Sequence, residues 1–204
     1  MAHWFAYGED ALTYWAIRER LDVILTQLGD ESDPYDATVF YRPSFGRRTS
    51  YDPDSPRAEF GEFDTIVATS RAIYPIEAKW YASQEVDGTK ITVKRKQVIR
   101  HSVFAWYFRK YVDFEVSWEY FVEKYDSTFR AVFPGKKLAP HGSVLADNIQ
   151  FVLRKLYSFD SEIIDVLLYL HPQDAPATIT VDPTSFAPVS VPFCLESKHG
   201  IFRL

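Results

Sequence analysis

The chain has 204 residues, of which 47% are hydrophobic and 25% are charged, and this balance excludes a disordered or fibrous protein. The length suits one globular domain with a single well-filled core. The formal net charge of −5 is unlike that of most nucleic-acid-binding domains, although a local basic patch can attract phosphate within a Debye length of about 10 Å.

The N-terminal segment and the cysteine content predict the compartment. Residues 1–4 lack the basic start and long apolar run of a signal peptide, and no later stretch is long enough to cross a bilayer. Cys194 is the only cysteine, which excludes an internal disulfide and a cysteine-based zinc cluster and fits a reducing compartment. We therefore expect a soluble, cytoplasmic protein without a membrane partner.

An amphipathic helix is predicted over about Gly8–Leu28. Its buried face is formed by apolar residues that recur at alternating steps of three and four, which is the spacing of one side of a helix. These residues are Tyr14, Ile17, Leu21, Ile24 and Leu28. Gly29-Asp30 ends the helix. A polar stretch with several prolines and arginines, about Arg42–Arg57, is predicted to be a loop.

Two strand-like runs follow, Phe63–Thr69 and Ala72–Trp80, with a short polar break between them. Their β-branched and aromatic residues predict an antiparallel hairpin. Pro75 has no amide donor, so we expect it at a bulge or an unpaired position of the second strand. The turn carries no strong two-residue signature, so the sequence leaves the register of the hairpin open.

A second amphipathic helix is predicted over about Val93–Tyr111. Its buried stripe is expected at Ile99, Val103, Trp106 and Lys110. Gln97, Arg100 and His101, spaced at i, i+3 and i+4, share another face of this helix.

The remainder of the chain is predicted as short helices and strands. Helices are expected at about 118–125, 143–156 and 161–170, and strands at about 129–133, 178–181 and 189–195. We expect one domain over 1–204, with a core over about 1–135 and a C-terminal elaboration over about 136–204.

Three polar residues of the hairpin carry its chemistry. Residues two apart on a strand share a face, so Glu77 and Lys79 project together, while Ala78 turns away and offers its backbone carbonyl. If the hairpin pairs, Asp64 on the partner strand reaches the same face. Two carboxylates and a carbonyl form an all-oxygen site suited to Mg²⁺. Such an ion could activate water and bind a phosphate oxygen, and Lys79 could orient that water or neutralise the transition state.

The segment Gly61-Glu62-Phe63-Asp64, followed by Ile76-Glu77-Ala78-Lys79, resembles the signature of the PD-(D/E)xK, or restriction-endonuclease-like, nuclease superfamily. In this form it is similar to archaeal Holliday-junction resolvases and RecB-type nuclease domains, with Phe63 in place of the proline of the motif name. The resemblance covers about Gly8–Tyr111. It implies an α/β fold with a central mixed sheet flanked by helices, to which a C-terminal extension of helices and short strands would be added. It also implies DNA cleavage with Mg²⁺, or Mn²⁺ as a substitute, by Asp64, Glu77 and Lys79.

The superfamily often adds an acidic residue on the first helix and a polar residue on the second. Glu9 matches the first as a further metal ligand, and Gln97 matches the second as a support for the lysine or the phosphate. Asp10 and Glu19 stay open as alternatives to Glu9, because the stripe of the first helix extrapolated backwards reaches Asp10.

Basic residues cluster near the proposed site and could hold DNA phosphates. One cluster opens the second helix and comprises Lys94, Arg95, Lys96, Arg100 and His101. Arg42, Arg47 and Arg48 form a second cluster in the polar loop. Phosphate contacts of this kind make binding fall steeply with salt. For any single residue, a solvated surface is an equal alternative.

The sequence favours a Mg²⁺-dependent deoxyribonuclease of repair, recombination or defence against foreign DNA. It offers no histidine ligand spacing, nucleophile elbow or phosphate-binding glycine loop for a different chemistry. Two alternatives stay open: a non-catalytic DNA-binding or assembly module that keeps the nuclease fold, and an unrelated α/β protein whose hairpin merely carries charge. The half after Tyr111 is expected to carry substrate specificity or a homodimer contact.

Overall fold

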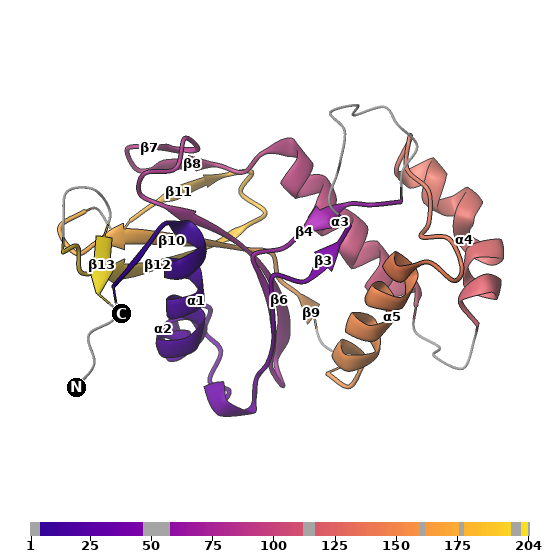
Figure 1. Cartoon of the computed structure of the whole chain (residues 1–204), viewed down its shortest axis with the longest axis horizontal. Helices are drawn as coiled ribbons and strands as arrows, with labels where there is room; N and C mark the ends of the chain where they lie inside the picture. The colour runs from indigo at the N-terminus through magenta and orange to yellow at the C-terminus, as the bar shows by residue number, and fades with distance from the viewer. Residues whose placement is uncertain are drawn as a thin grey trace. The chain divides into compact units, whose positions relative to one another are not determined.

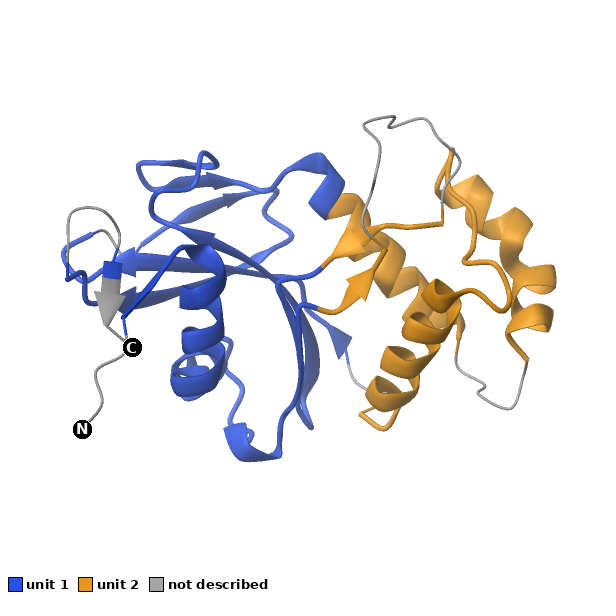
Figure 2. Ribbon diagram, viewed as in Figure 1, with its two compact units in different colours: residues 1–42, 63–97, 161–204 blue, residues 43–62, 98–160 orange. Residues whose placement is uncertain are grey.

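The computed structural model describes residues 5–46, 58–111, 117–159, 162–175, 178–196 and 201–203. The chain forms two compact units, which are blue and orange in Figure 2. The first consists of Met1–Arg42, Phe63–Gln97 and Ser161–Leu204, and the second of Pro43–Glu62 and Val98–Asp160. This division does not follow the boundary expected near residue 135, because the last part of the chain returns to the first unit.

A six-stranded mixed sheet forms the centre of the first unit, in the order β12-β10-β6-β5-β2, with β9 also paired to β6. Its strands are β2 (Thr38–Tyr41), β5 (Thr65–Ala68), β6 (Ala72–Trp80), β9 (Glu162–Ile163), β10 (Val166–Pro172) and β12 (Ala187–Phe193). Strands β2, β5 and β6 pair antiparallel, whereas β9 and β10 pair parallel to β6, and β12 pairs parallel to β10. The predicted hairpin and the α/β class with a central mixed sheet are confirmed.

Pro75 lies opposite Ile66 in the ladder between β5 and β6. On its other side, β6 pairs with β9 at Ala72 and Ile73 and with β10 from Ile76 onwards. The missing amide of Pro75 thus coincides with the interval between two pairing partners, where no ladder hydrogen bond has to be given up.

Helices α1 (Glu9–Glu19) and α2 (Leu21–Gln27) cover one face of the sheet (Figure 1). The sequence predicted one helix, but the backbone leaves helical geometry at Arg20, with φ −134° and ψ 20°. Tyr14 is exposed instead of buried, because Leu12, Ala16 and Ile17 form the inward side of α1. These side chains pack on the β6, β10 and β12 residues that face the same way.

Alternate residues of β6 face opposite sides of the sheet. Tyr74, Ile76 and Ala78 belong to the core under α1 and α2. Glu77 and Lys79 therefore face the other side, and only 1% and 5% of their surfaces are exposed. Charged residues are seldom buried to this degree without a partner, so Glu77 and Lys79 are expected to have polar partners on this face of the sheet.

Smaller elements complete the first unit. Strands β7 (Val86–Asp87), β8 (Lys90–Thr92) and β11 (Thr180–Asp182) form a sheet in the order β11-β8-β7. In Figure 1 this sheet lies on the side of β10 and β12 opposite to α1 and α2. Strands β1 (Phe5–Tyr7) and β13 (Ile201–Arg203) pair with each other, and a short 3-10 helix, η1, spans Pro34–Asp36.

The second unit is mainly helical and has an aromatic core. It contains β3 (Ser44–Phe45), β4 (Gly61–Glu62), most of α3 (Arg95–Lys110), α4 (Trp118–Val132) and α5 (Val144–Tyr157). The ring of Tyr107 contacts those of Phe60, Trp118 and Phe121. The Tyr107 hydroxyl accepts a hydrogen bond from the Ala139 amide at 3.0 Å, which satisfies its polar end inside the core.

Elements later in the chain also differ from the sequence predictions. A helix was expected over 161–170, but 162–163 form β9 and 166–170 most of β10, because a short, wholly buried apolar run has the same pattern in a core strand and in a buried helix. Residues 129–133 were expected to be a strand, but 129–132 end helix α4, and Phe129 joins its buried side. In α3, Lys110 is exposed, whereas Gln97 and His101, expected on another face, are buried.

Within the described residues, no helix combines the length and the apolar character that a membrane-spanning segment needs.

Candidate functional site

The register of the hairpin brings Asp64 next to Glu77. Thr65 pairs with Ile76, so the next step of the same ladder sets Asp64 opposite Glu77. Asp64 Oδ2 accepts a hydrogen bond from the backbone amide of Ala78 at 2.8 Å, which fixes this carboxylate at the edge of β6. Asp64, directly before β5, and Glu77 of β6 are therefore near enough to interact electrostatically.

Lys79 lies beside this pair. Its Nζ donates to the backbone carbonyl of Ala78 at 2.8 Å, so the lysine folds back over its own strand. The carbonyl oxygen of Ala78 has two lone pairs, and this hydrogen bond occupies one of them. The carbonyl predicted as a metal ligand is therefore shared with Lys79.

Gln97 at the start of α3 anchors Glu77. Gln97 Nε2 donates to Glu77 Oε2 at 2.7 Å, and Gln97 Oε1 accepts from the backbone amide of Lys94 at 3.0 Å. Both ends of the Gln97 amide are thereby fixed, which holds one oxygen of the buried Glu77 carboxylate in place. The sequence predicted support for the lysine or the phosphate, whereas the observed partner is the second carboxylate.

Glu9 is the acidic residue of the first helix that reaches the site. Its Oε1 lies 3.9 Å from Lys79 Nζ, and its Oε2 accepts from the Trp80 amide at 3.1 Å and the Ser83 hydroxyl at 2.6 Å. The two alternatives point elsewhere: Asp10 pairs with Arg42, and Glu19 pairs with Arg18 at 3.3 Å.

The electrostatics of the pair are unfavourable for two ionised carboxylates. Burial and the neighbouring Glu77 raise the pKa of Asp64 to about 7, although the Ala78 amide and the Lys79 ammonium act in the opposite direction. Glu9 adds a smaller contribution that raises the pKa further. At Asp64, burial and the neighbouring carboxylates therefore outweigh the amide donor and the ammonium.

This donor set fits a hard divalent cation. Burial and repulsion from Glu77 raise the pKa of Asp64, and a cation beside the two carboxylates would offset both effects; carboxylate and carbonyl oxygens are the ligands that Mg²⁺ prefers. Within the described ranges, no three His, Cys, Asp or Glu side chains form a metal-binding group. The protein would therefore supply Asp64, Glu77 and the Ala78 carbonyl, and water or phosphate would complete the coordination, as is common for Mg²⁺.

Three further polar residues share the face of Lys79, and the sequence analysis missed their position. Lys79 is in register with Tyr169 of β10, and Tyr169 with Ser190 of β12, so their side chains lie in one row. The His171 ring stacks on that of Tyr169, with centroids 5.1 Å apart. Assigning residues 161–170 to a helix hid this row, whereas the alternation of polar and apolar residues from Leu168 to His171 is a signal that could have shown it.

The predicted basic residues differ in their surroundings. Lys94 forms an ion pair with Glu85, and this contact lowers the pKa of Glu85 against the effect of burial. Arg95 and Lys96 are exposed on the first turn of α3. Arg100 donates to the Glu62 carbonyl, and His101 is 1% exposed, which prevents direct phosphate contact in this conformation. Arg47 and Arg48 lie outside the described residues.

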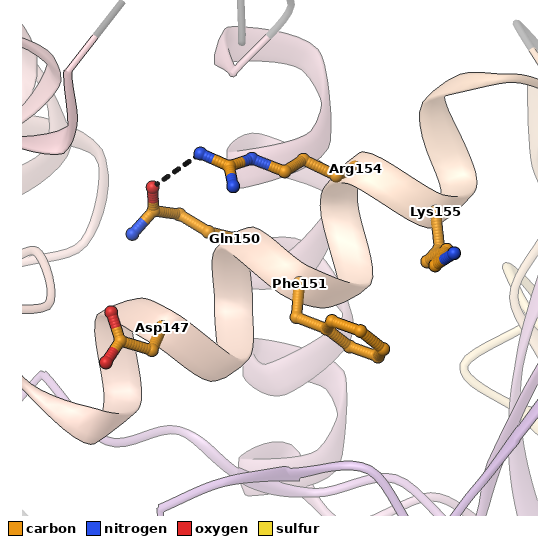
Figure 3. A pocket seen from close by; sticks show the side chains of 5 residues that line it. All are labelled: Asp147, Gln150, Phe151, Arg154 and Lys155. Atoms are coloured by element: carbon orange, nitrogen blue, oxygen red, sulfur yellow. Dashed lines mark hydrogen bonds between the residues drawn. The ribbon is translucent and has the colours of Figure 1, made fainter.

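A separate hollow of about 690 Å³ lies beside α5 in the second unit (Figure 3). Its lining comes from one side of the helix: Asp147, Gln150, Phe151, Arg154 and Lys155. Arg154 donates to Gln150 at 3.3 Å. The lining includes none of the residues of the carboxylate cluster, by which we mean Asp64, Glu77, Lys79 and Glu9.

The chain was compared with protein-family models, with curated proteins and with solved structures. None of the three comparisons found a match. The resemblance to the nuclease superfamily therefore depends on the motif residues and on their geometry alone.

Proposed function

We propose that the protein is a Mg²⁺-dependent deoxyribonuclease that hydrolyses phosphodiester bonds at Asp64, Glu77 and Lys79. The observation that supports this most strongly is the proximity of the Asp64 and Glu77 carboxylates beside a buried lysine, where burial and the charge of Glu77 raise the pKa of Asp64 to about 7. A purely structural role gives no reason for this crowding, because apolar residues on these core strands would avoid the cost of burying charge.

A bound divalent ion would act as a Lewis acid and lower the pKa of a coordinated water. The protein's own residues have separate tasks. Asp64 and Glu77 would hold the ion, and Gln97 keeps Glu77 in position through the 2.7 Å hydrogen bond. The ammonium of the buried Lys79 side chain would orient the attacking water or offset negative charge that develops on the phosphate.

DNA is proposed as the substrate, with Arg95 and Lys96 as phosphate contacts near the start of α3. Both side chains are exposed, and Gln97, one residue further along, binds Glu77 of the cluster. Cationic side chains of this kind hold the phosphate backbone without reading its sequence. The cytoplasm is the proposed compartment, in keeping with a single cysteine.

The test is a cleavage assay on a panel of labelled duplex, single-stranded, branched and RNA substrates with Mg²⁺ or Mn²⁺. We expect cleavage of at least one DNA substrate by the wild-type protein, and loss of this cleavage in Asp64→Ala and in Lys79→Ala while both variants stay folded. Ca²⁺ should support DNA binding with little cutting, since it binds oxygen ligands with a looser geometry. Full activity of the Asp64→Ala protein would refute the mechanism.

The same assay separates the proposal from the non-catalytic alternative. Salt-sensitive DNA binding without cleavage of any substrate in Mn²⁺ would assign the chain to a DNA-binding or assembly module. Absence of both DNA binding and Mn²⁺ binding would leave an α/β protein whose hairpin carries charge for another reason.

A further inference from the structure

Both carboxylate oxygens of Glu9 have neighbours at the end of β6, which is more than a metal ligand or a simple surface residue needs. Its Oε2 accepts two hydrogen bonds, one from the Trp80 amide and one from the Ser83 hydroxyl, at 3.1 and 2.6 Å. Its Oε1 lies 3.9 Å from Lys79 Nζ. One oxygen is therefore bound by Trp80 at the end of β6 and by Ser83 in the turn that follows, and the other lies within ion-pair distance of the lysine.

Stabilisation of the helix end does not account for these contacts. An acidic residue in the first turn of a helix interacts favourably with the helix dipole wherever its side chain points. Asp10 also lies in this turn, and its side chain is 67% exposed and paired with Arg42. The Glu9 side chain, at 29% exposure, instead reaches the end of strand β6.

The lysine needs such an anchor. A lysine side chain has a flexible four-carbon stem, so its ammonium has no fixed position of its own. Lys79 Nζ is held by the Ala78 carbonyl at 2.8 Å and lies within ion-pair distance of Glu9. Ser83 in turn restrains Glu9, because its hydroxyl donates to the same carboxylate.

We infer that Glu9 is a positioning residue for Lys79, that Ser83 restrains Glu9 in this role, and that neither residue ligates the metal. This inference rests on the proposed nuclease function for its effect on the reaction, but the restraint on Lys79 can be measured without any activity. It departs from the expectation that Glu9 is a metal ligand.

The experiment compares the full-length wild-type protein with Glu9→Gln, Ser83→Ala and the matched control Asp10→Asn. Glutamine keeps the size of Glu9 and a hydrogen-bond acceptor but removes the negative charge next to Lys79. Asparagine at position 10 removes the same charge from the same helical turn without changing the contacts of Lys79. Three quantities are measured: the acetylation rate of Lys79 by acetic anhydride in mass spectrometry, the Mn²⁺ affinity by calorimetry, and kcat and KM for DNA cleavage.

In Glu9→Gln we expect Lys79 to be acetylated roughly tenfold faster and kcat to fall roughly tenfold or more, because a small misplacement of a reacting group is costly. KM and the Mn²⁺ affinity should stay within about twofold of the wild type, since the carboxylates that hold the ion are unchanged. Ser83→Ala should shift the acetylation rate and kcat in the same direction by less, and Asp10→Asn should shift neither.

Two results would overturn the inference. An unchanged acetylation rate of Lys79 in folded Glu9→Gln would show that Glu9 does not hold the lysine. A loss of Mn²⁺ affinity as large as that in Asp64→Asn would make Glu9 a ligand. If Glu9→Gln does not fold, Ser83→Ala decides the question through the same rates. Lack of cleavage by the wild-type protein would overturn the proposed function, while the acetylation rates would still report on the restraint of Lys79.

Discussion

Asp30, which contacts Thr69 at the turn between β5 and β6, and Asp64, directly before β5, are both acidic but have very different neighbours. Asp30, 3% exposed, accepts hydrogen bonds from the Thr69 hydroxyl at 2.6 Å, the Tyr74 hydroxyl at 2.8 Å and the Ser32 amide at 2.9 Å. Asp64 accepts one from the Ala78 amide and lies beside Glu77. Asp30 thus accepts hydrogen bonds from three residues, whereas Asp64 has one amide donor and lies beside another carboxylate.

The pKa values follow from this difference. Burial alone would raise the pKa of Asp30, but the hydrogen bonds from Thr69, Ser32 and Tyr74 outweigh it and hold the pKa below its ordinary value. At Asp64, burial and Glu77 outweigh the donors, and the pKa rises to about 7. A carboxylate with several donors contributes to the stability of the fold, while a carboxylate beside a like charge is a candidate functional group.

The largest expected effect is on catalysis. Glu77→Gln removes a charged ligand of the proposed ion but preserves the size of the side chain, so we expect cleavage to fall by roughly 10² to 10³-fold, comparable with the loss of one electrostatic contact in a transition state. Asp30→Asn serves as the matched control, because Asp30 takes no part in the proposed chemistry. Steady-state cleavage with Mn²⁺ measures both. Equal losses in the two variants would remove the distinction between the two carboxylates.

The second expected effect is on stability, and here the larger loss is expected at Asp30. Asp30→Ala removes the acceptor of the buried Tyr74 hydroxyl and the shorter of two hydrogen bonds of the Thr69 hydroxyl, so we expect a loss of about 3 kcal/mol in the free energy of unfolding. Asp64→Asn keeps an acceptor for the Ala78 amide and removes the repulsion from Glu77. At pH 8 this variant should be at least as stable as the wild type in urea unfolding. A large loss of stability in Asp64→Asn would show that Asp64 is also structural.

A divalent cation should stabilise the wild-type protein. At a Mn²⁺ concentration a hundredfold above the dissociation constant, binding to the folded state alone adds about 2.7 kcal/mol. Asp30→Asn should gain the same amount, and Asp64→Asn much less, because only Asp64 belongs to the proposed ligands. Thermal unfolding with and without Mn²⁺ tests this, and a gain that Asp64→Asn retains in full would place the ion elsewhere.

The pH dependence of stability should differ in sign between the two carboxylates. Asp64 has a higher pKa folded than unfolded, so between about pH 4 and pH 7 the folded state binds more protons and loses stability as the pH rises. Asp30 has a lower pKa folded, so its contribution is present above its unfolded pKa and is lost as the pH falls through the folded value.

Urea unfolding of the metal-free protein tests this difference. Relative to Asp64→Asn, the wild-type protein should lose on the order of 1 kcal/mol per pH unit between about pH 4 and pH 7, and little beyond. Saturating Mn²⁺ should remove the slope. Parallel stability curves for the wild type and Asp64→Asn would mean that Asp64 titrates normally.

The sequence predicted the structure best where the alternation of side chains along a strand determines the geometry. It predicted the hairpin, the shared face of Glu77 and Lys79 and the approach of Asp64, because strand alternation is a local rule. It did not find Ser83, whose link to Glu9 joins residues 74 positions apart. It also left Glu9, Asp10 and Glu19 unresolved, because the direction of a helix relative to a sheet depends on packing and not on the helical period.

The C-terminal part shows the complementary failure. Residues 166–170 are all buried, so the apolar pattern could not separate a core strand from a helix, and only pairing with β6 and β12 decides the outcome. The row formed by Lys79, Tyr169 and Ser190 was missed with that assignment. The position of this segment in the central sheet depends on pairing with strands that are distant in the sequence, so a short stretch of sequence cannot predict it.

The smallest expected effect concerns DNA binding by the cationic side chains at the start of α3. Arg95 and Lys96 are exposed, and Lys94 is paired with Glu85, so the first two should contact phosphates more readily than the third. Removing one phosphate contact lowers the slope of log K against log salt by about 0.9 for duplex DNA. We therefore expect Arg95→Gln and Lys96→Gln each to weaken binding a few-fold and to reduce this slope by up to about 1, with Lys94→Gln affecting it less. Fluorescence anisotropy at several salt concentrations, with Ca²⁺ in place of Mg²⁺, gives the slopes. Equal slopes for all three variants and the wild type would move the DNA contact away from α3 and leave the carboxylate cluster without the cationic approach that a polyanionic substrate requires.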